Sequence, residues 1–412
     1  MKWLSVMPSS RICRRRKGMK TMEAGEIRRT DVDDQRSAQR ARLRSAPSLF
    51  WRLVLLCIGI RVGLEVIGLL SLDFHGQPVW THALDMWKRW DAQGYLRIAD
   101  RGYVGAPSPN ADDPFDIALF PLFPLAVHVV SLAVQNLVLS ALVVSFAASV
   151  GAGYFLFRLV ALDADEAAAW RAVFLLFSFP TAYFLAAPFT EALFLFAVLA
   201  SVYAARTGRW AGSGVAGALA TGTRMTGIAL APALLVEVFA RRTGVRDRVR
   251  RLAWISVAGC GLLIYLAINY FVHGDPLWFI EVQRTHWSNQ LVPPWEPVRG
   301  AIVSLLAGGN DDMMTFIFRG RVAGVLVALP LLVLAVGRLR LPDLLYGWAS
   351  FVLILSSSWL ISLPRYLLVL YPLFIVGSRL GRSPRVLIPF ILAGVALQGW
   401  LMWLYAGGDW TF

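Results

Sequence analysis

Cysteine, histidine and charge are all scarce in this sequence. The three cysteines, Cys13, Cys57 and Cys260, lie far apart, so they provide neither a disulfide framework nor the spacing of a metal site. The sequence also lacks a glycine-rich phosphate loop after a strand, a nucleophile elbow, and a paired catalytic cysteine and histidine. These absences give no support for redox chemistry or for soluble nucleotide-dependent chemistry.

Hydrophobic residues are correspondingly abundant. They make up 57% of the 412 residues, and the mean hydropathy is +0.58, whereas ordinary soluble domains are roughly 45 to 50% apolar. Sixteen tryptophans and eleven tyrosines suit the aromatic belts of a membrane protein. The net charge of +14 does not require nucleic acid, because lysine and arginine accumulate in cytoplasmic loops. The composition predicts an all-α polytopic membrane protein that binds no nucleic acid.

The first 48 residues differ from the rest of the chain. They hold thirteen lysines or arginines against five acidic residues and show almost no apolar periodicity. This pattern predicts a disordered basic cytoplasmic tail, residues 1–48, before a membrane domain, residues 49–412. A mis-assigned start, with Met19 or Met22 as the true beginning, is the alternative. No secretory signal is expected, because no small-residue cleavage site follows the first apolar segment.

Long apolar segments follow the tail, and about 20 residues suffice to cross a hydrocarbon core of roughly 30 Å. Ten to eleven crossings are expected, although Pro180 and Pro188 leave the middle pair open to being broken or re-entrant. The apolar segments lie near residues 49–72, 118–134, 137–160, 171–187, 189–206, 210–239, 252–272, 320–337, 343–361, 365–379 and 385–405.

The distribution of basic residues predicts which loops share a face of the membrane. With the tail inside, residues 73–116 and 274–300 lie outside, and the arginine-rich turns at 241–251 and 379–385 lie inside. The sequence at 362–365 then also faces outside.

Four polar clusters interrupt the apolar chain. The first, residues 90–103, places two aspartates, two arginines and two tyrosines in one short run, which favours a site for a polar ligand. A solvated helix whose aspartates and arginines only pair with one another remains an equal alternative. The other three clusters are residues 221–227, 275–295 and 364–366.

Arg224 stands within the apolar segment 210–239. An arginine at a helix centre costs about 2.5 to 3.5 kcal/mol on insertion scales, so an anionic partner or a polar cavity is expected beside it. The alternative is an arginine near the end of a span that reaches the interface. His273 and His286 lack cysteine or carboxylate partners at ligand spacing, so no metal site is predicted.

Seven short segments follow one another along the apolar part of the chain. They are WDAQGYLRIADRGY (90–103), LFPLFPL (119–125), FPTA (179–182), TEALF (190–194), TRMTG (223–227), GDPL (274–277) with Gln283, Trp287, Pro294 and Trp295, and LPRY (363–366). In this order they resemble the PIG-V family of mannosyltransferases and its bacterial relatives. The chain departs from the family pattern at Phe179, Thr190, Met225 and Thr226, so acceptor recognition is not carried over.

The resemblance implies a GT-C type glycosyltransferase in the cell membrane, with the active site on the extracytoplasmic side. Its first outer loop would supply the catalytic base, Asp91, and its donor would be a polyprenyl-phosphate sugar, most simply mannose. The acceptor would be a glycolipid, a glycan or a protein. No cofactor is evident, although a divalent metal is not excluded. The implied phosphate-binding residues are Arg224, Arg365, Arg97 and Arg284, and the implied substrate-positioning residues are Trp90, Tyr95, Gln283, Trp287, Trp295 and Glu191.

Two other classes of function remain open at this point. A lipid-linked saccharide transporter or flippase would also place arginines and aromatic rings in a polar cavity, but the sequence shows no internal repeats. A non-catalytic scaffold would be expected to lack the loop aspartate, and Asp91 is present.

Overall fold

The computed structural model describes residues 46–103, 115–309 and 311–412. Within these residues the protein is helical, and the extended backbone forms no strand beyond one isolated bridge between Leu291 and Ser357. The all-α class predicted from composition is therefore confirmed. The predicted basic tail up to residue 45, and Asp112 and Asp113 of the first polar loop, lie outside the described residues.

The chain divides into two units, Met1–Val54 and Leu55–Phe412. In the first unit the structure describes only the start of helix α2, which continues into the second unit, where all the other elements lie. The elements are α2 (Ala46–Phe74), α3 (Val79–His82), η1 (Asp85–Trp87), α4 (Asp91–Arg101), η2 (Phe115–Ala118), α5 (Leu122–Val134), α6 (Leu137–Val160), α7 (Glu166–Phe177), η3 (Ala182–Leu185), α8 (Glu191–Arg206), α9 (Trp210–Thr223), η4 (Met225–Ala229), α10 (Leu230–Phe239), α11 (Val245–Ser256), η5 (Val257–Gly259), α12 (Cys260–His273), α13 (Trp278–Trp287), α14 (Glu296–Ala307), α15 (Asp312–Ala335), α16 (Leu341–Leu355), α17 (Leu363–Tyr366), η6 (Leu367–Val369), α18 (Tyr371–Leu380) and α19 (Pro384–Gly407).

Fewer single helices can cross a membrane than the ten to eleven that were expected. Among the described residues, five helices are long and apolar enough, and six if the pair Leu363–Val369 and Tyr371–Leu380, bent by 79°, counts as one broken span. Several expected spans are instead helices of 12 to 16 residues, among them α5, α7, α8 and α16. At 1.5 Å per residue these reach about 18 to 24 Å, less than a full hydrocarbon core.

The apolar segment 210–239 was predicted as one span, and this prediction was wrong. The helix breaks at Arg224, whose backbone is extended, so α9 ends there and η4 and α10 turn back. Gly227 permits the turn, because a Cβ at this position would lie 2.8 Å from backbone atoms of Thr221. Arg224 therefore stands at a turn between two helices rather than in the middle of one.

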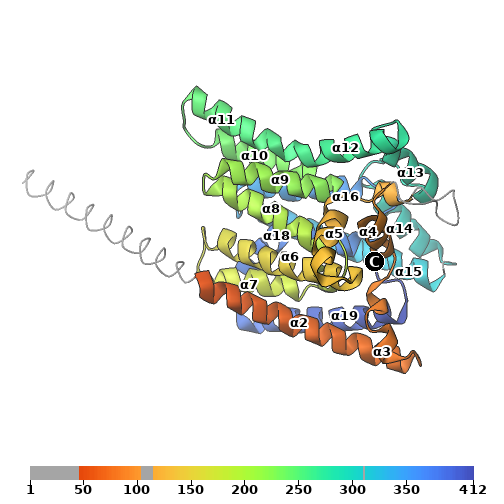
Figure 1. The fold of residues 1–412 in the computed structure, drawn as a ribbon. Coiled ribbons are helices and arrows are strands. Elements are labelled where there is room, and N and C mark those ends of the chain that lie inside the picture. Colours follow the sequence, from red (N-terminus) through yellow and green to blue (C-terminus); the bar gives the residue numbers. More distant parts are fainter. Residues whose placement is uncertain (1–45, 104–114, 310) are drawn as a thin grey trace, which may run out of the picture. The chain divides into compact units, whose positions relative to one another are not determined.

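Helices α6 to α10 lie side by side within the second unit (Figure 1). Helix α8 begins beside Arg224, which pairs with Glu191, and it ends where Arg241 donates to the carbonyl of Arg206. The region around Asp91 and the turn at residues 241–251 are consequently at opposite ends of α8 and α9, as the distribution of charge predicted. With 14 residues, α9 separates these ends by about 20 Å.

Candidate active site

Four charged side chains from distant parts of the sequence form a row of alternating sign. Asp91 Oδ2 lies 3.3 Å from Arg365 Nη2, and Arg365 Nε lies 3.1 Å from Glu191 Oε1. The same carboxylate oxygen accepts a hydrogen bond of 2.5 Å from Arg224 Nη1. The sequence predicted an anionic partner for Arg224, and Glu191 is that partner. The row carries no net charge.

The ends of helices place three of these four residues. Asp91 and Glu191 are the first residues of α4 and α8, where a carboxylate interacts favourably with the positive end of the helix dipole. Arg224 follows the last residue of α9, where a cation is favoured. Arg365 comes from the short helix α17. The helices around the site thus lower the free energy of the charges they bring together.

Burial differs along the row. The side chain of Glu191 is fully buried, that of Arg365 is 8% exposed, and that of Asp91 is 40% exposed. A buried charge is stable only when it is paired, so the arginines depend on Glu191. Asp91 is the member of the row that a substrate can reach most easily.

Glu191 does not satisfy all of its own hydrogen-bonding capacity. Its Oε2 atom is buried and accepts no hydrogen bond from any described residue. Arg365 Nε is close enough to Glu191 for an ion pair but lacks the geometry of a hydrogen bond. Arg224 also donates to Thr190 Oγ1 at 2.9 Å. Donors and acceptors remain available here for a further polar group.

Aromatic rings line the two arginines. The Arg365 guanidinium lies 5.1 to 5.2 Å from the ring centres of Phe184, Phe189 and Tyr366, and Arg224 lies 5.1 Å from Tyr366. Each contact favours a cation through the quadrupole of the ring.

Tyr95 projects from α4 into the same region and is buried. Burial raises the pKa of its phenol well above the usual value, and the negative charge of Asp91 raises it further. Tyr95 therefore remains a neutral hydroxyl at physiological pH and can donate a hydrogen bond.

Trp90 adopts an unusual backbone conformation directly before Asp91. Its φ is 46°, a region that non-glycine residues adopt at a cost of about 1 to 3 kcal/mol. Its ring is held edge to face against Tyr405 and Trp410, each at 5.1 Å. Tyr183 also donates a hydrogen bond to Thr411 Oγ1. The end of the chain thus helps to fix the backbone that aims Asp91.

The sequence did not indicate that residues 405–411 pack beside Trp90. No pattern connects Trp410 with Trp90, which precedes it by more than 300 residues. The only signal was the number of aromatic residues in the last apolar segment and beyond it.

The remaining predicted site residues do not join the charged row. Arg97 forms an exposed ion pair with Asp116 at 2.7 Å, and Arg284 forms one with Glu281 at 2.9 Å. The pair of Arg97 with Asp116 matches the simpler interpretation that was left open for the first loop, in which its charges only pair with one another. Asp91 does not match that interpretation.

Helix α13 lies beside η2 rather than beside Asp91 itself. Trp287 packs against Ile117, Ala118 and Val282. Gln283 accepts a hydrogen bond from Asn289, and Trp295 is 68% exposed. Backbone bonds between residues 290–292 and 356–358 connect this region to the chain leading to Arg365. The four polar clusters therefore gather at the same end of the helices, although only three contribute to the row.

A cavity of about 610 Å³ lies among these helices, although none of the four charged residues lines it. It lies between the last residues of α4, helix α5, helix α9 and helix α12, and its lining is largely apolar. Gly222, two residues before Arg224, forms part of its wall. The cavity could accommodate part of a hydrocarbon chain whose polar end reaches Arg224.

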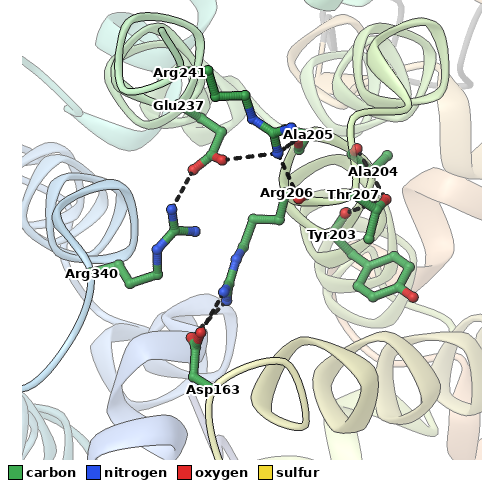
Figure 2. A network of polar contacts seen from close by, with 9 residues as sticks. All are labelled: Asp163, Tyr203, Ala204, Ala205, Arg206, Thr207, Glu237, Arg241 and Arg340. Carbon is green, nitrogen blue, oxygen red and sulfur yellow. Dashed lines mark hydrogen bonds and ion pairs between the residues drawn. The ribbon is translucent and has the colours of Figure 1, made fainter. Parts of the chain in front are cut away.

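A second charged network occupies the opposite end of α8 (Figure 2). Arg206 donates two hydrogen bonds to Asp163, at 2.6 and 2.8 Å, and Arg241 donates to the carbonyls of Ala205 and Arg206. Glu237 lies between Arg241 and Arg340 (Figure 2). Arginines near a helix C-terminus that bind its last carbonyls are a common way of ending a helix. This network is explained by the ends of the helices alone.

No group of three or more potential metal-ligating side chains (His, Cys, Asp or Glu) occurs among the described residues.

The family model for mannosyltransferase (PIG-V) matches residues 64–243. The match includes Asp91, Glu191 and Arg224, whereas Arg365 lies beyond it. No curated protein and no solved structure matches the chain.

Proposed function

We propose that the chain is a mannosyltransferase related to the PIG-V family, whose model matches residues 64–243, and that it transfers mannose from a polyprenyl phosphate to an acceptor hydroxyl by an inverting displacement. The observation that carries the proposal is the row in which a partly exposed aspartate contacts the buried Arg365, which shares the carboxylate of Glu191 with Arg224. The family match favours an enzyme over a lipid-linked saccharide transporter.

In this mechanism the two arginines hold the phosphate of the donor. Arg224 donates to one oxygen of Glu191, and Arg365 lies within ion-pair distance of the same oxygen, so a phosphate would share their remaining N–H groups. The cavity would receive the part of the prenyl chain nearest to the phosphate. Charge-assisted bonds to the phosphate stabilise the negative charge that develops as the sugar leaves.

Asp91 acts as the general base. The acceptor oxygen attacks C1 of the mannose, the bond between C1 and the phosphate oxygen breaks, and its electron pair remains on the phosphate. The proton of the acceptor passes to Asp91. A phosphate that draws Arg365 away would weaken the 3.3 Å contact with Asp91 and leave that carboxylate oxygen available to the acceptor hydroxyl.

The assay that tests this function uses membranes from cells with and without the protein. Radiolabelled polyprenyl-phosphate mannose is added, and the products are separated. We expect a new labelled product only in membranes that contain the wild-type protein. Transfer from a nucleotide sugar, without transfer from the lipid-linked sugar, would contradict the proposed donor.

We further propose that the site faces the extracytoplasmic side of the plasma membrane. The support is the excess of arginine at residues 241–251, at the other end of α9. Cysteines introduced at Ser108 and Asn289 should react with an impermeant thiol reagent in intact cells. Protection of both until the membrane is permeabilised would reverse the orientation.

A further inference from the structure

Arginine is concentrated where α10 meets α11. Residues 241–251 contain six arginines and a single acidic residue, Asp247. These residues lie at the end of α9 opposite Arg224, so they have no part in the proposed transfer reaction. The inference drawn here does not depend on that reaction.

Several of these cations pack against aromatic rings. The guanidinium groups of Arg241 and Arg251 lie 5.5 and 5.2 Å from the centre of the same indole ring, that of Trp210. Arg248 lies 5.5 Å from the ring centre of Phe239. These contacts stabilise the cations and help to hold them in place.

The nearby carboxylates are too few to pair with each arginine of residues 241–251. Asp247 is shared by Arg250 and Arg251, and Glu237 is already shared by Arg241 and Arg340.

Some donors in the turn consequently remain without a partner. Arg251 is more than nine-tenths buried, yet its Nε and Nη1 atoms donate to no described residue. Arg248 Nε likewise donates to no described residue, and Thr243 Oγ1 forms no hydrogen bond within the described part of the chain. Buried donors without acceptors are costly, so an anionic group is expected to satisfy them.

The exposed face of the turn has the character of a membrane-surface helix. Arg242 and Arg246 are exposed, and so are the apolar side chains of Val245, Val249 and Trp254. Helix α11 also leads directly into the apolar helix α12, with which it forms a candidate membrane span. Basic side chains next to such a span bind anionic headgroups, while adjacent apolar side chains contact acyl chains.

We propose that Arg242, Arg246, Arg248 and Arg251, with Thr243, bind the phosphate of an anionic phospholipid at the membrane surface. The exposed apolar side chains favour a lipid over free phosphate, which offers them no partner. Occupancy would hold α10 and α11 together at the ends of α8 and α9.

Lipid binding to the purified full-length protein in detergent tests the proposal. Phosphatidylglycerol and phosphatidylcholine are titrated separately, and the bound lipid is counted by native mass spectrometry. The wild type should bind phosphatidylglycerol at least about 10-fold more tightly. Removal of two arginines in Arg246→Gln/Arg248→Gln should weaken this binding by about 30-fold, since each basic residue near an anionic surface contributes about fivefold.

The double variant Arg382→Gln/Arg385→Gln is the matched control. It removes the same charge from another exposed turn and should retain the affinity of the wild type. Equal losses in both variants would show that only net charge matters and would overturn the proposal. So would equal affinities of the wild type for the two lipids, or displacement of bound phosphatidylglycerol by equimolar inorganic phosphate. If the site variant does not fold, the two lipids compared on the wild type still decide the outcome.

Discussion

The two ends of helix α8 both hold ion pairs, but the arrangements differ. At the Arg206 end, arginines bind the last carbonyls of the helix as well as Asp163 and Glu237 (Figure 2). At the Glu191 end, two arginines share one oxygen of a single carboxylate, whose second oxygen accepts no hydrogen bond from the described residues. Backbone carbonyls accept hydrogen bonds in the first set, whereas the second set pairs side chains with one another.

This difference shows which charged cluster is open to a ligand. A network satisfied by the backbone gains little from an added phosphate, because its donors are already occupied. A row of side chains with an exposed aspartate at one end can exchange partners when substrate arrives. The following predictions compare matched residues from the two ends.

The largest effect is expected from Glu191→Gln. It leaves Arg224 and Arg365 buried without their common carboxylate, and breaking such a pair destabilises a protein by about 3 to 5 kcal/mol. Thermal unfolding in detergent measures the loss. Glu237→Gln is the control and should be milder, because Arg241 keeps two carbonyl acceptors and the side chain of Arg340 is 36% exposed. Similar losses for both variants would remove the distinction between the ends.

Asp91→Asn should abolish most transfer while leaving expression and donor binding near normal. Asparagine cannot accept the proton, and a positioned general base contributes about 10² to 10⁴ in rate, so a loss of at least about 100-fold is expected. The rate of labelled mannose transfer is measured alongside Asp163→Asn and the loop variants Asp85→Asn, Asp100→Asn and Asp116→Asn. If one of these abolishes transfer and Asp91→Asn does not, the base has been assigned to the wrong residue.

Arg224→Gln should lower turnover or raise the apparent KM for the donor by about 10-fold or more, as the loss of a charge-assisted hydrogen bond would do. Arg206→Gln, at the other end of the helices, should lower stability but leave the donor KM unchanged. Normal kinetics in Arg224→Gln together with a loss in Arg365→Gln would assign the phosphate to Arg365 alone.

Trp410→Ala should have the smallest effect. It removes one of the two rings that hold Trp90, and an aromatic pair contributes about 0.5 to 1.5 kcal/mol, so transfer should fall by about 2- to 10-fold. Trp170→Ala is the control. It also removes an indole with two ring contacts, to Phe157 and Phe174, but Trp170 follows Asp163 by seven residues in the sequence, and Asp163 belongs to the charged network at the other end of α8. Transfer that falls equally in both variants would indicate a general loss of packing.

Much of this comparison was predictable from sequence, because it depends on local chemistry. Hydropathy predicted the helical membrane class, and the distribution of arginine placed residues 90–103 and 241–251 at opposite ends. The break at Arg224 was missed, because an apolar segment of about 30 residues resembles a single span whether or not the chain turns within it. Gly227 was the available signal, since it allows the backbone to approach Thr221 closely.

The partners within the site were harder to predict. The sequence predicted an anion for Arg224 but could not identify it as Glu191, because the pairing depends on which helices lie side by side. Arg97 and Arg284 had the right charge for binding phosphate, yet each lies close to a carboxylate and pairs with it on the surface. The packing of Trp410 against Trp90 arises only from tertiary structure.

The most direct test of the difference between the two ends is an electron cryomicroscopy structure with a polyprenyl phosphate bound. We predict that the phosphate lies within hydrogen-bonding distance of Arg224 and Arg365, with the first isoprene units in the cavity beside Gly222 and with Asp91 facing the phosphate. A phosphate bound to Arg206 and Arg241, or to Arg284 on α13, would contradict the account.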